Sequence, residues 1–143
     1  GTLDKYTPGG APDGDYIVLK YARFAFEKFP KADDRLTTQM KSVKFEIFIP
    51  ETHLTVLRQA LRSVGAGQLG NYDSCLAYSR VTGSWRPLEG ASPYEGKVGE
   101  LCEAPELKVE LRVDADRAEE TLAAIRAVHP YETPEIFVIP LLG

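Results

Sequence analysis

The most regular feature of the sequence is an alternation of apolar and polar residues that occurs twice. Residues 43–49 read VKFEIFI and residues 107–113 read LKVELRV, so the two copies begin 64 positions apart. Successive side chains of a strand point to opposite faces, so each copy predicts a β-strand with one apolar face. The sequence therefore predicts two equivalent strands in the core of a duplicated domain.

A helical pattern follows the first copy. Pro50 and Glu51 suit a first helical turn, where amides lack partners and an acid favours the dipole. An apolar stripe then recurs at three- and four-residue spacing, and its members are Leu54, Leu57, Leu61 and Val64. Residues 65–67, with two glycines, are expected to end this helix, because glycine readily adopts the left-handed conformation of a C-terminal cap.

The segment between the copies and the end of the chain predict two further strands. Residues 72–81 form the first, followed by a turn at residues 82–83 into a short segment around Trp85. Residues 87–95 contain two prolines and a glycine and are expected to form a loop. Residues 135–142 are the last predicted strand.

The second copy is also followed by a helical pattern, which ends at Val128 and which Asp114 or Asp116 is expected to cap. The predicted order is strand, helix, strand, strand, helix, strand. Two similar halves in this order are typical of an α+β, ferredoxin-like split βαβ sandwich with an antiparallel or mixed sheet. Right-handed connections place both helices on one face, and we expect the repeated strands to be the central pair and to run parallel.

The face of the sheet away from the helices is expected to carry charged side chains of both signs. They are Lys44, Glu46, Lys108, Glu110 and Arg112. Such a face is usually solvated, although interleaved charges also permit pairing with the sheet of a second subunit.

Residues 1–39 do not share this pattern. Residues 1–14 are rich in Gly, Pro and Asp and predict a linker or turns, whereas residues 15–29 alternate and predict one strand. Met40, the one methionine of the chain, comes directly before the first copy. We interpret residues 1–39 as an N-terminal extension, linker or fusion segment and residues 40–143 as the core domain. An internal methionine there by chance is the alternative.

Composition narrows the function classes. The net charge is −4 and the basic residues are scattered, which disfavours nucleic acid and anionic membranes, since both require a concentrated positive surface. No apolar run approaches the roughly 20 residues that span a bilayer, and the N-terminus shows no secretory signal pattern. Cys75 and Cys102 lack paired-cysteine spacing and are interpreted as reduced thiols of a cytoplasmic protein, with a disulfide as the alternative.

The densest group of polar residues is HPYETP at residues 129–134. His129, Tyr131 and Glu132 are candidates to line a cleft, as a metal ligand, a hydrogen-bond donor or an acid–base group. The alternative is structural. In that interpretation His129 caps the helix C-terminus and the two prolines hold the connection to the last strand.

A glycine-rich run, GAGQLGNYDSC at residues 65–75, is the second candidate. It follows a helix, whereas phosphate-binding loops lead from a strand into a helix, so a nucleotide-phosphate loop is disfavoured. Cys75 would need a base such as His129 beside it to act as a nucleophile, and a buried structural thiol is the alternative. The spacing predicts no tetrahedral zinc site, while a weak or intersubunit metal site at His129 and Glu132 stays open.

Three motifs resemble a known family. GNYDSC at residues 70–75, GSWRPLEG at residues 83–90 and HPYETP at residues 129–134 occur in this order in the YqfO-type domain. That domain is the insert of bacterial Nif-three-like proteins and also occurs as a stand-alone protein, and the resemblance covers residues 40–143. The HPYE motif is also similar to that of CutA-type divalent-cation-tolerance proteins.

The resemblance implies a CutA- or PII-like fold, a homotrimer formed through sheet edges, and a ligand or ion site near the clefts between subunits. It implies no established reaction. Full-length Nif-three-like proteins hold a two-metal centre in flanking domains with histidine-rich motifs. This chain has two histidines and lacks those flanks, so that centre is not expected here, and a divalent metal ion would bind elsewhere.

Together these observations favour a non-catalytic, oligomeric binding or regulatory module for a small ligand, an ion or a partner protein. The candidate ligand-binding residues are Tyr72, Cys75, Trp85, Arg86 and Tyr131, and the candidate metal ligands are His129 and Glu132. Tyr72 and Trp85 are predicted to form an apolar wall, and Arg86 is predicted to contact an anion. Plain packing for Trp85 and a surface ion pair for Arg86 are the alternatives.

Two other functions stay open at this point. One is a divalent-metal-binding protein or metal-dependent hydrolase whose site lies between subunits. The other is a purely structural oligomerisation domain. In the structural case, changes at His129 and Glu132 would lower stability or assembly without affecting any ligand.

Overall fold

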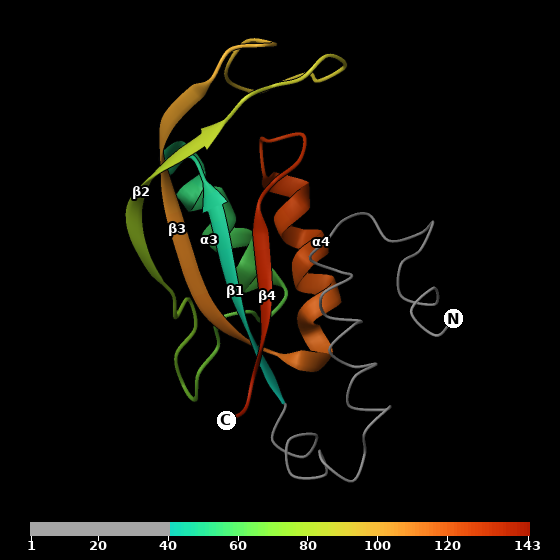
Figure 1. The fold of residues 1–143 in the computed structure, drawn as a ribbon. Helices are drawn as coiled ribbons and strands as arrows, with labels where there is room; N and C mark the ends of the chain where they lie inside the picture. Colours follow the sequence, from blue (N-terminus) through green and yellow to red (C-terminus); the bar gives the residue numbers. More distant parts are fainter. Residues whose placement is uncertain (1–40) are drawn as a thin grey trace, which may run out of the picture.

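The computed structural model describes residues 41–143. The predicted extension of residues 1–39, its strand at residues 15–29 and the start at Met40 lie outside the described residues. The described chain contains, in order, β1 (Ser42–Ile49), the 3-10 turn η2 (Glu51–His53), α3 (Leu54–Ser63), β2 (Ala77–Trp85), β3 (Cys102–Asp114), the 3-10 turn η3 (Ala115–Arg117), α4 (Ala118–Val128) and β4 (Ile136–Leu141) (Figure 1).

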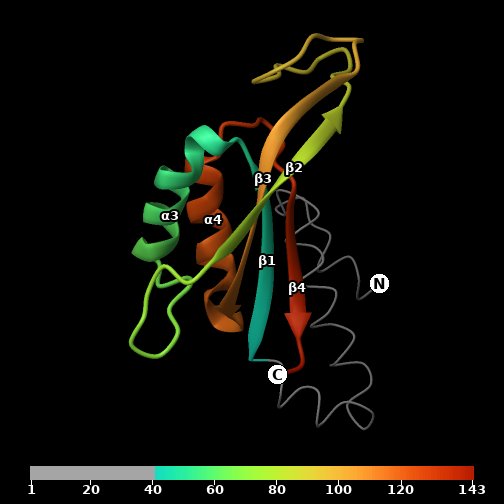
Figure 2. The same cartoon turned by 90° about the vertical axis from the view of Figure 1, so that its left-hand side faces the viewer.

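The four strands form one antiparallel sheet in the order β2-β3-β1-β4. Both helices lie on the same face of this sheet (Figure 2). This arrangement is the βαββαβ sandwich that the hydrophobic pattern predicts. The predicted ferredoxin-like α+β fold class is therefore confirmed.

The two repeated strands, β1 and β3, are the central pair, but they run antiparallel, so the predicted parallel arrangement is wrong. The segment containing α3 brings β2 back parallel to β1, and the connection from β2 to β3 then reverses the chain. β3 must therefore run opposite to β1. Glu46 pairs with Glu110, its own counterpart 64 positions later, so an approximate two-fold axis through this pair relates the two halves.

The position of β2 also differs from the prediction. The strand spans Ala77–Trp85 instead of residues 72–81, and it continues through the predicted turn at residues 82–83. Gly83 lies within the ladder, where an added Cβ would overlap the carboxylate of Glu106. Gly83 therefore makes room for this carboxylate within a strand and does not mark a turn.

Two further element ends differ from the prediction. β3 begins at Cys102 instead of residue 107, since its first residues pair with the second half of β2. Neither Asp114 nor Asp116 caps α4 through its side chain, because Asp114 precedes η3 and Asp116 lies within it. The N-cap residue of α4 is Arg117, whose guanidinium donates a 3.0 Å hydrogen bond to a carbonyl at the end of α3.

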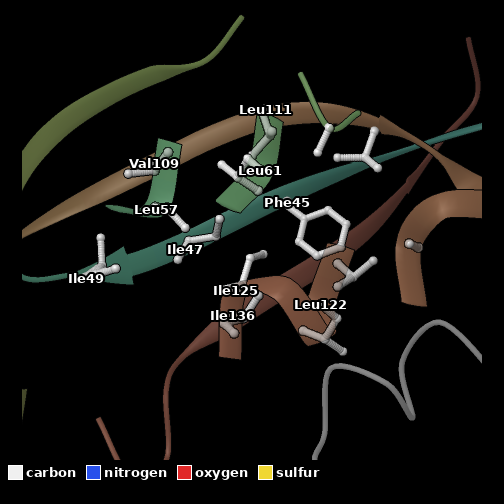
Figure 3. Close-up of a cluster of buried hydrophobic side chains, with 14 of the residues drawn as sticks. Phe45, Ile47, Ile49, Leu57, Leu61, Val109, Leu111, Leu122, Ile125 and Ile136 are labelled. Carbon is white, nitrogen blue, oxygen red and sulfur yellow. The ribbon is translucent and has the colours of Figure 1, made fainter. Parts of the chain in front are cut away.

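The hydrophobic core lies between the sheet and the two helices (Figure 3). Every second residue of β1 points into it and is fully buried, and the labelled partners from the helices are Leu57, Leu61, Leu122 and Ile125. Burying one such side chain stabilises the fold by about 1.5–3 kcal/mol relative to leaving it exposed. The predicted apolar faces are thus what holds the helices to the sheet.

The opposite face of the sheet carries the predicted charged cluster. Lys44 Nζ lies 2.9 Å from Glu46 Oε2 and 2.6 Å from Glu110 Oε1, and Lys108 Nζ lies 3.7 Å from Glu46 Oε1. The hydrogen bond from Lys44 lowers the pKa of Glu110. Strand β4 presents apolar side chains to the same face, so this face is charged along its centre and apolar along one edge.

Leu57→Ala is expected to destabilise the domain by about 2–5 kcal/mol, because it leaves a cavity between α3 and the sheet at a fully buried position. Val56→Ala, at the neighbouring position where the side chain is 37% exposed, is the matched control and should change stability by less than about 1 kcal/mol. Urea unfolding followed by circular dichroism measures both. Equal losses for the two variants would contradict this account of how α3 is held.

Candidate functional site

A cavity of about 640 Å³, the end pocket, lies at one end of the sheet. Two segments enclose it: loop 86–101, which joins β2 to β3, and turn 129–135, which leads from α4 to β4. Both segments are found at the same end of the domain, where β2 and β3 extend past the helices (Figure 1). The length of these two strands therefore determines where the pocket forms.

Aromatic side chains from three segments form the walls of the end pocket. The ring centroid of Tyr131 lies 5.7 Å from that of Trp85 and 5.8 Å from that of Tyr94. Favourable aromatic pairs have centroids about 4.5–7 Å apart. The Nε1–H group of Trp85 donates a 3.0 Å hydrogen bond to the carbonyl of Glu95, which fixes the indole against the loop. The other aromatic residues of the lining are Phe48 and Phe137.

His129 is buried against Tyr131 and holds it in place. The Nδ1 atom of His129 accepts a 3.1 Å hydrogen bond from the backbone N–H of Tyr131, so Nε2 carries the proton and donates to the carbonyl of Phe48 over 2.7 Å. Burial lowers the pKa of His129 despite its bond to Phe48, so the ring is neutral at neutral pH. His129 occupies the C-cap position of α4, yet its side chain bonds β1 and not the end of the helix.

Glu132 joins the two segments that enclose the end pocket. Its carboxylate oxygens accept hydrogen bonds from the backbone N–H of Ser92, at 3.3 and 3.0 Å. A charged acceptor makes such a bond stronger than a neutral one would be. The contact ties loop 86–101 to turn 129–135 and defines the rim of the pocket.

A buried carboxylate also lines the end pocket. Glu106 of β3 is 6% exposed, and its side chain lies across Gly83. Among residues 41–143 no basic side chain forms an ion pair with it. Burial raises the pKa of Tyr131, and the nearby Glu106 carboxylate raises it further. The Tyr131 hydroxyl is fully buried and makes no hydrogen bond of normal geometry within the described part of the chain.

The charges around the end pocket are mostly negative. Four carboxylates line it, from Glu95, Glu106, Glu132 and Glu135, against the guanidinium of Arg86. Arg86 is exposed, and so are Glu95, Glu132 and Glu135, so solvent and salt weaken the fields of all four inside the cavity. Glu106 is the buried charge of the lining. The end pocket therefore combines apolar walls with one buried negative charge, that of Glu106.

Most of the candidate residues from the sequence meet at this place. Trp85, Arg86, Tyr131 and Glu132 line the end pocket, and His129 supports Tyr131 from behind with its ring centroid 5.0 Å away. The sequence motifs GSWRPLEG and HPYETP thus converge, although they are far apart in the chain. Their convergence results from the shared end of the sheet.

Tyr72 and Cys75 do not join this group. Tyr72 is 75% exposed and pairs with Leu69, while Cys75 donates a backbone hydrogen bond to Gly67. Strand β2 separates Cys75 from Trp85 by roughly 30 Å, at about 3.3 Å per residue. The predicted apolar wall of Tyr72 and Trp85 is therefore wrong, and Cys75 cannot reach His129.

Glu106 and Tyr94 are among the residues of the end pocket that are absent from the sequence-based candidates. The alternation of residues 107–113, extended backwards, places Glu106 on the charged face, where an acid predicts contact with solvent. Its burial arises because loop 86–101 and turn 129–135 close over that end of the face. No local pattern signals such a closure, so only the folded structure identifies these residues.

The described residues give limited support for a metal site. In the range 41–143 no group of three His, Cys, Asp or Glu side chains is placed to hold a metal ion. Both ring nitrogens of His129 already make hydrogen bonds, so a metal would have to break one of them. The carboxylates of the end pocket are the remaining oxygen donors near His129.

Of the described helices, none has the length and apolar character needed to cross a membrane.

Known proteins are similar to the chain over this region. Residues 90–143 match the family model described as CutA1 divalent ion tolerance protein. The GTP cyclohydrolase 1 type 2 homolog of Halalkalibacterium halodurans is 40% identical over 105 residues, which cover 73% of this chain and 28% of that protein. A solved Bacillus cereus protein related to NIF3 is 33% identical, with a TM-score of 0.63, over 73% of this chain and 26% of that one. The chain belongs to the Nif-three-like family.

Within the Nif-three-like family, this chain spans about a quarter of the length of the relatives it matches. The fold is also that of smaller proteins. CutA1 from Ehrlichia chaffeensis has a TM-score of 0.54 at 18% identity, over 73% of this chain and 84% of that one. The predicted family and the predicted CutA-like fold are thus confirmed.

The buried, neutral His129 predicts a loss of stability in acid. Its imidazole titrates near pH 6.5 in the unfolded chain, whereas its pKa in the folded domain is lower. As the pH falls, the unfolded chain binds this proton first, so stability should decrease from about pH 6.5 until the lowered folded pKa is passed.

Urea unfolding of wild type, His129→Gln and His53→Gln between pH 8 and pH 5 measures this effect. The His53→Gln control should keep most of the wild-type decrease, because burial is the largest cause of the lowered pKa of His129 and the charge of His53 the smallest. His129→Gln should show a much shallower decrease. A His129→Gln variant with the full wild-type slope would contradict the assignment.

Proposed function

We propose that this domain is a non-catalytic binding module that holds a small organic molecule in the end pocket. The observation that carries the proposal is the cavity of about 640 Å³, walled by aromatic rings and lined by a buried carboxylate. Ligand pockets in proteins are typically about 300–1,000 Å³ and mostly apolar, with a few polar groups that fix orientation. The end pocket has this size and this composition.

The groups that could perform acid–base or nucleophilic chemistry are poorly suited to it. His129 uses both ring nitrogens to position Tyr131 and β1. Burial raises the pKa of the Tyr131 phenol and of the Cys102 thiol, so neither ionises readily at neutral pH. These side chains support binding better than they support a reaction.

The same arrangement supports a regulatory role. The end pocket is closed by the bond between Glu132 and Ser92, which connects two separate segments of the chain. A ligand that contacts both segments would favour the closed loop and bias the surface that the loop presents. A partner protein that binds this surface would then distinguish the ligand-bound domain from the free domain.

We further propose that the domain acts as a homo-oligomer, for which the resemblance to CutA-type proteins favours a trimer. Phe137 and Ile139 on β4 are 39% and 38% exposed on the open face of the sheet. Strand β4 is an edge strand of this sheet. An apolar edge of this kind is better sheltered by a second copy than left in water.

A divalent-metal site, alone or within a hydrolase whose site lies between subunits, is the second candidate. Two observations favour it: the matching family is described as a divalent ion tolerance protein, and four carboxylates line the end pocket. Carboxylate oxygens from two or more subunits would be needed to complete such a site. Titration of the protein with zinc, copper and manganese salts tests this candidate, with the fluorescence of Trp85 as the readout.

Trp85 is the one tryptophan of the chain and lies in the pocket wall, so its fluorescence should report on occupancy. We expect a panel of cationic, neutral and anionic small molecules to contain at least one that changes this emission saturably. Tyr131→Ala should weaken that response at least about tenfold, because it removes the ring between the other two walls. Tyr72→Ala, at the opposite end of β2, is the control and should bind like wild type.

The outcome separates the functions. A saturable response to metal salts and to no organic molecule would favour the metal candidate. No response to any organic molecule or metal would leave a structural oligomerisation domain and would refute the binding proposal.

Assembly is tested at a residue outside the end pocket. Ile139→Lys is expected to convert an oligomer into monomer, since it places a charge on the apolar edge of the open face. Val56→Lys, on the exposed side of α3, should leave the mass unchanged. Light scattering of the full chain measures both, and a monomeric wild type would disprove the oligomer.

A further inference from the structure

The end pocket contains negative charge without a positive partner. Glu106 is 94% buried, as its 6% exposure implies, and it lines the cavity without an ion pair in the described part of the chain. Burying an ionised carboxylate is costly unless a cation or hydrogen-bond donors satisfy it. The hydroxyl of Tyr131 beside it also has no hydrogen-bond partner among residues 41–143. The carboxylate of Glu106 therefore lines the cavity without a cation beside it, and the Tyr131 hydroxyl lies buried next to it.

The walls around this charge are of the kind that binds cations. Trp85, Tyr94 and Tyr131 lie in consecutive ring contacts of 5.7 and 5.8 Å. The negative face of an aromatic ring attracts a cation within about 6 Å of its centroid, and cages of such rings recognise quaternary ammonium groups. A small metal ion would have to lose its water shell against these apolar walls, which favours an organic cation.

The remaining charges agree with this choice. Glu95 and Glu135 are exposed at the rim and add only a screened negative potential, and Glu132 already accepts the amide of Ser92. The one basic residue of the lining, Arg86, is exposed to solvent. An anionic ligand would therefore meet repulsion inside the cavity and weak attraction at its rim.

We propose that the ligand of the end pocket is a small organic ammonium ion, held by the Trp85–Tyr94–Tyr131 cage and neutralised by Glu106. This inference rests on the proposed function and adds the chemical class of the ligand. In the complex, the cationic group lies against the rings while its charge offsets the buried carboxylate. The ligand thus completes an electrostatic pair that the chain leaves open.

The test compares ligands that differ in charge and hardly in shape. Choline is compared with 3,3-dimethyl-1-butanol, its uncharged carbon isostere, and phenylethylamine is compared with phenylethanol. Each compound is titrated into the protein, with Trp85 fluorescence and calorimetry as readouts. In wild-type protein we expect at least one ammonium ion to bind about tenfold or more tightly than its neutral counterpart. That ratio is measured without any substitution, so it does not depend on a variant that folds.

Glu106→Gln keeps the shape of the side chain and removes its charge. It should weaken binding of the ammonium ion about tenfold while leaving the neutral isostere unaffected. Glu103→Gln, an exposed position on the same strand and outside the lining, is the matched control and should bind both like wild type.

The outcomes distinguish the ammonium inference from the proposed binding function. Equal binding of charged and neutral ligands, or binding of neutral or anionic molecules alone, would overturn the ammonium inference and leave the binding function in place. If no organic molecule of any charge produces a saturable fluorescence change, both the ammonium inference and the binding function are overturned. A preference for the ammonium ion that persists in Glu106→Gln would remove Glu106 from the site.

Discussion

The antiparallel pairing of β1 with β3 is the interaction on which the rest of the domain depends. Residues 43–49 lie opposite residues 107–113, and their core-facing side chains are almost fully buried against both helices. Strands β2 and β4 add to the two sides of this ladder. Because the axis through Glu46 and Glu110 exchanges the halves, equivalent segments of the two copies leave the sheet at opposite ends. The glycine-rich segment after α3 and turn 129–135 after α4 therefore lie at opposite ends of the sheet.

The end pocket forms where the two copies differ. Gly65 and His129 occupy equivalent positions, 64 residues apart, after the two helices. The first opens the glycine-rich segment at one end of the sheet, and the second opens turn 129–135 at the other end. Loop 86–101 lies at the same end of the sheet as turn 129–135, because β2 and β3 extend past the helices there (Figure 1). Duplication therefore supplies the scaffold, and the site uses one unduplicated loop with one divergent turn.

Local patterns predicted the elements well and their meeting points less well. The period-two alternation placed β1 correctly, and the apolar stripe of α3 matches its buried side. Gly83 suggested a turn because glycine usually marks one, yet here it makes room for the Glu106 side chain. The predicted parallel direction of the central strands would have placed both divergent segments at one end. The separation of Tyr72 from Trp85 has a different cause, because strand β2 lies between them in the chain and ends at Trp85.

The sequence by itself determined the order of the elements, the buried face of each strand, and the candidate motifs GSWRPLEG and HPYETP. These features follow from side-chain periodicity and backbone preference, which act over a few residues. Only the tertiary structure decided the direction of the central strands, the burial of Glu106 and the meeting of Trp85, Tyr94 and Tyr131. These depend on contacts between segments distant in the chain, where the free energy of packing, not local preference, selects the arrangement.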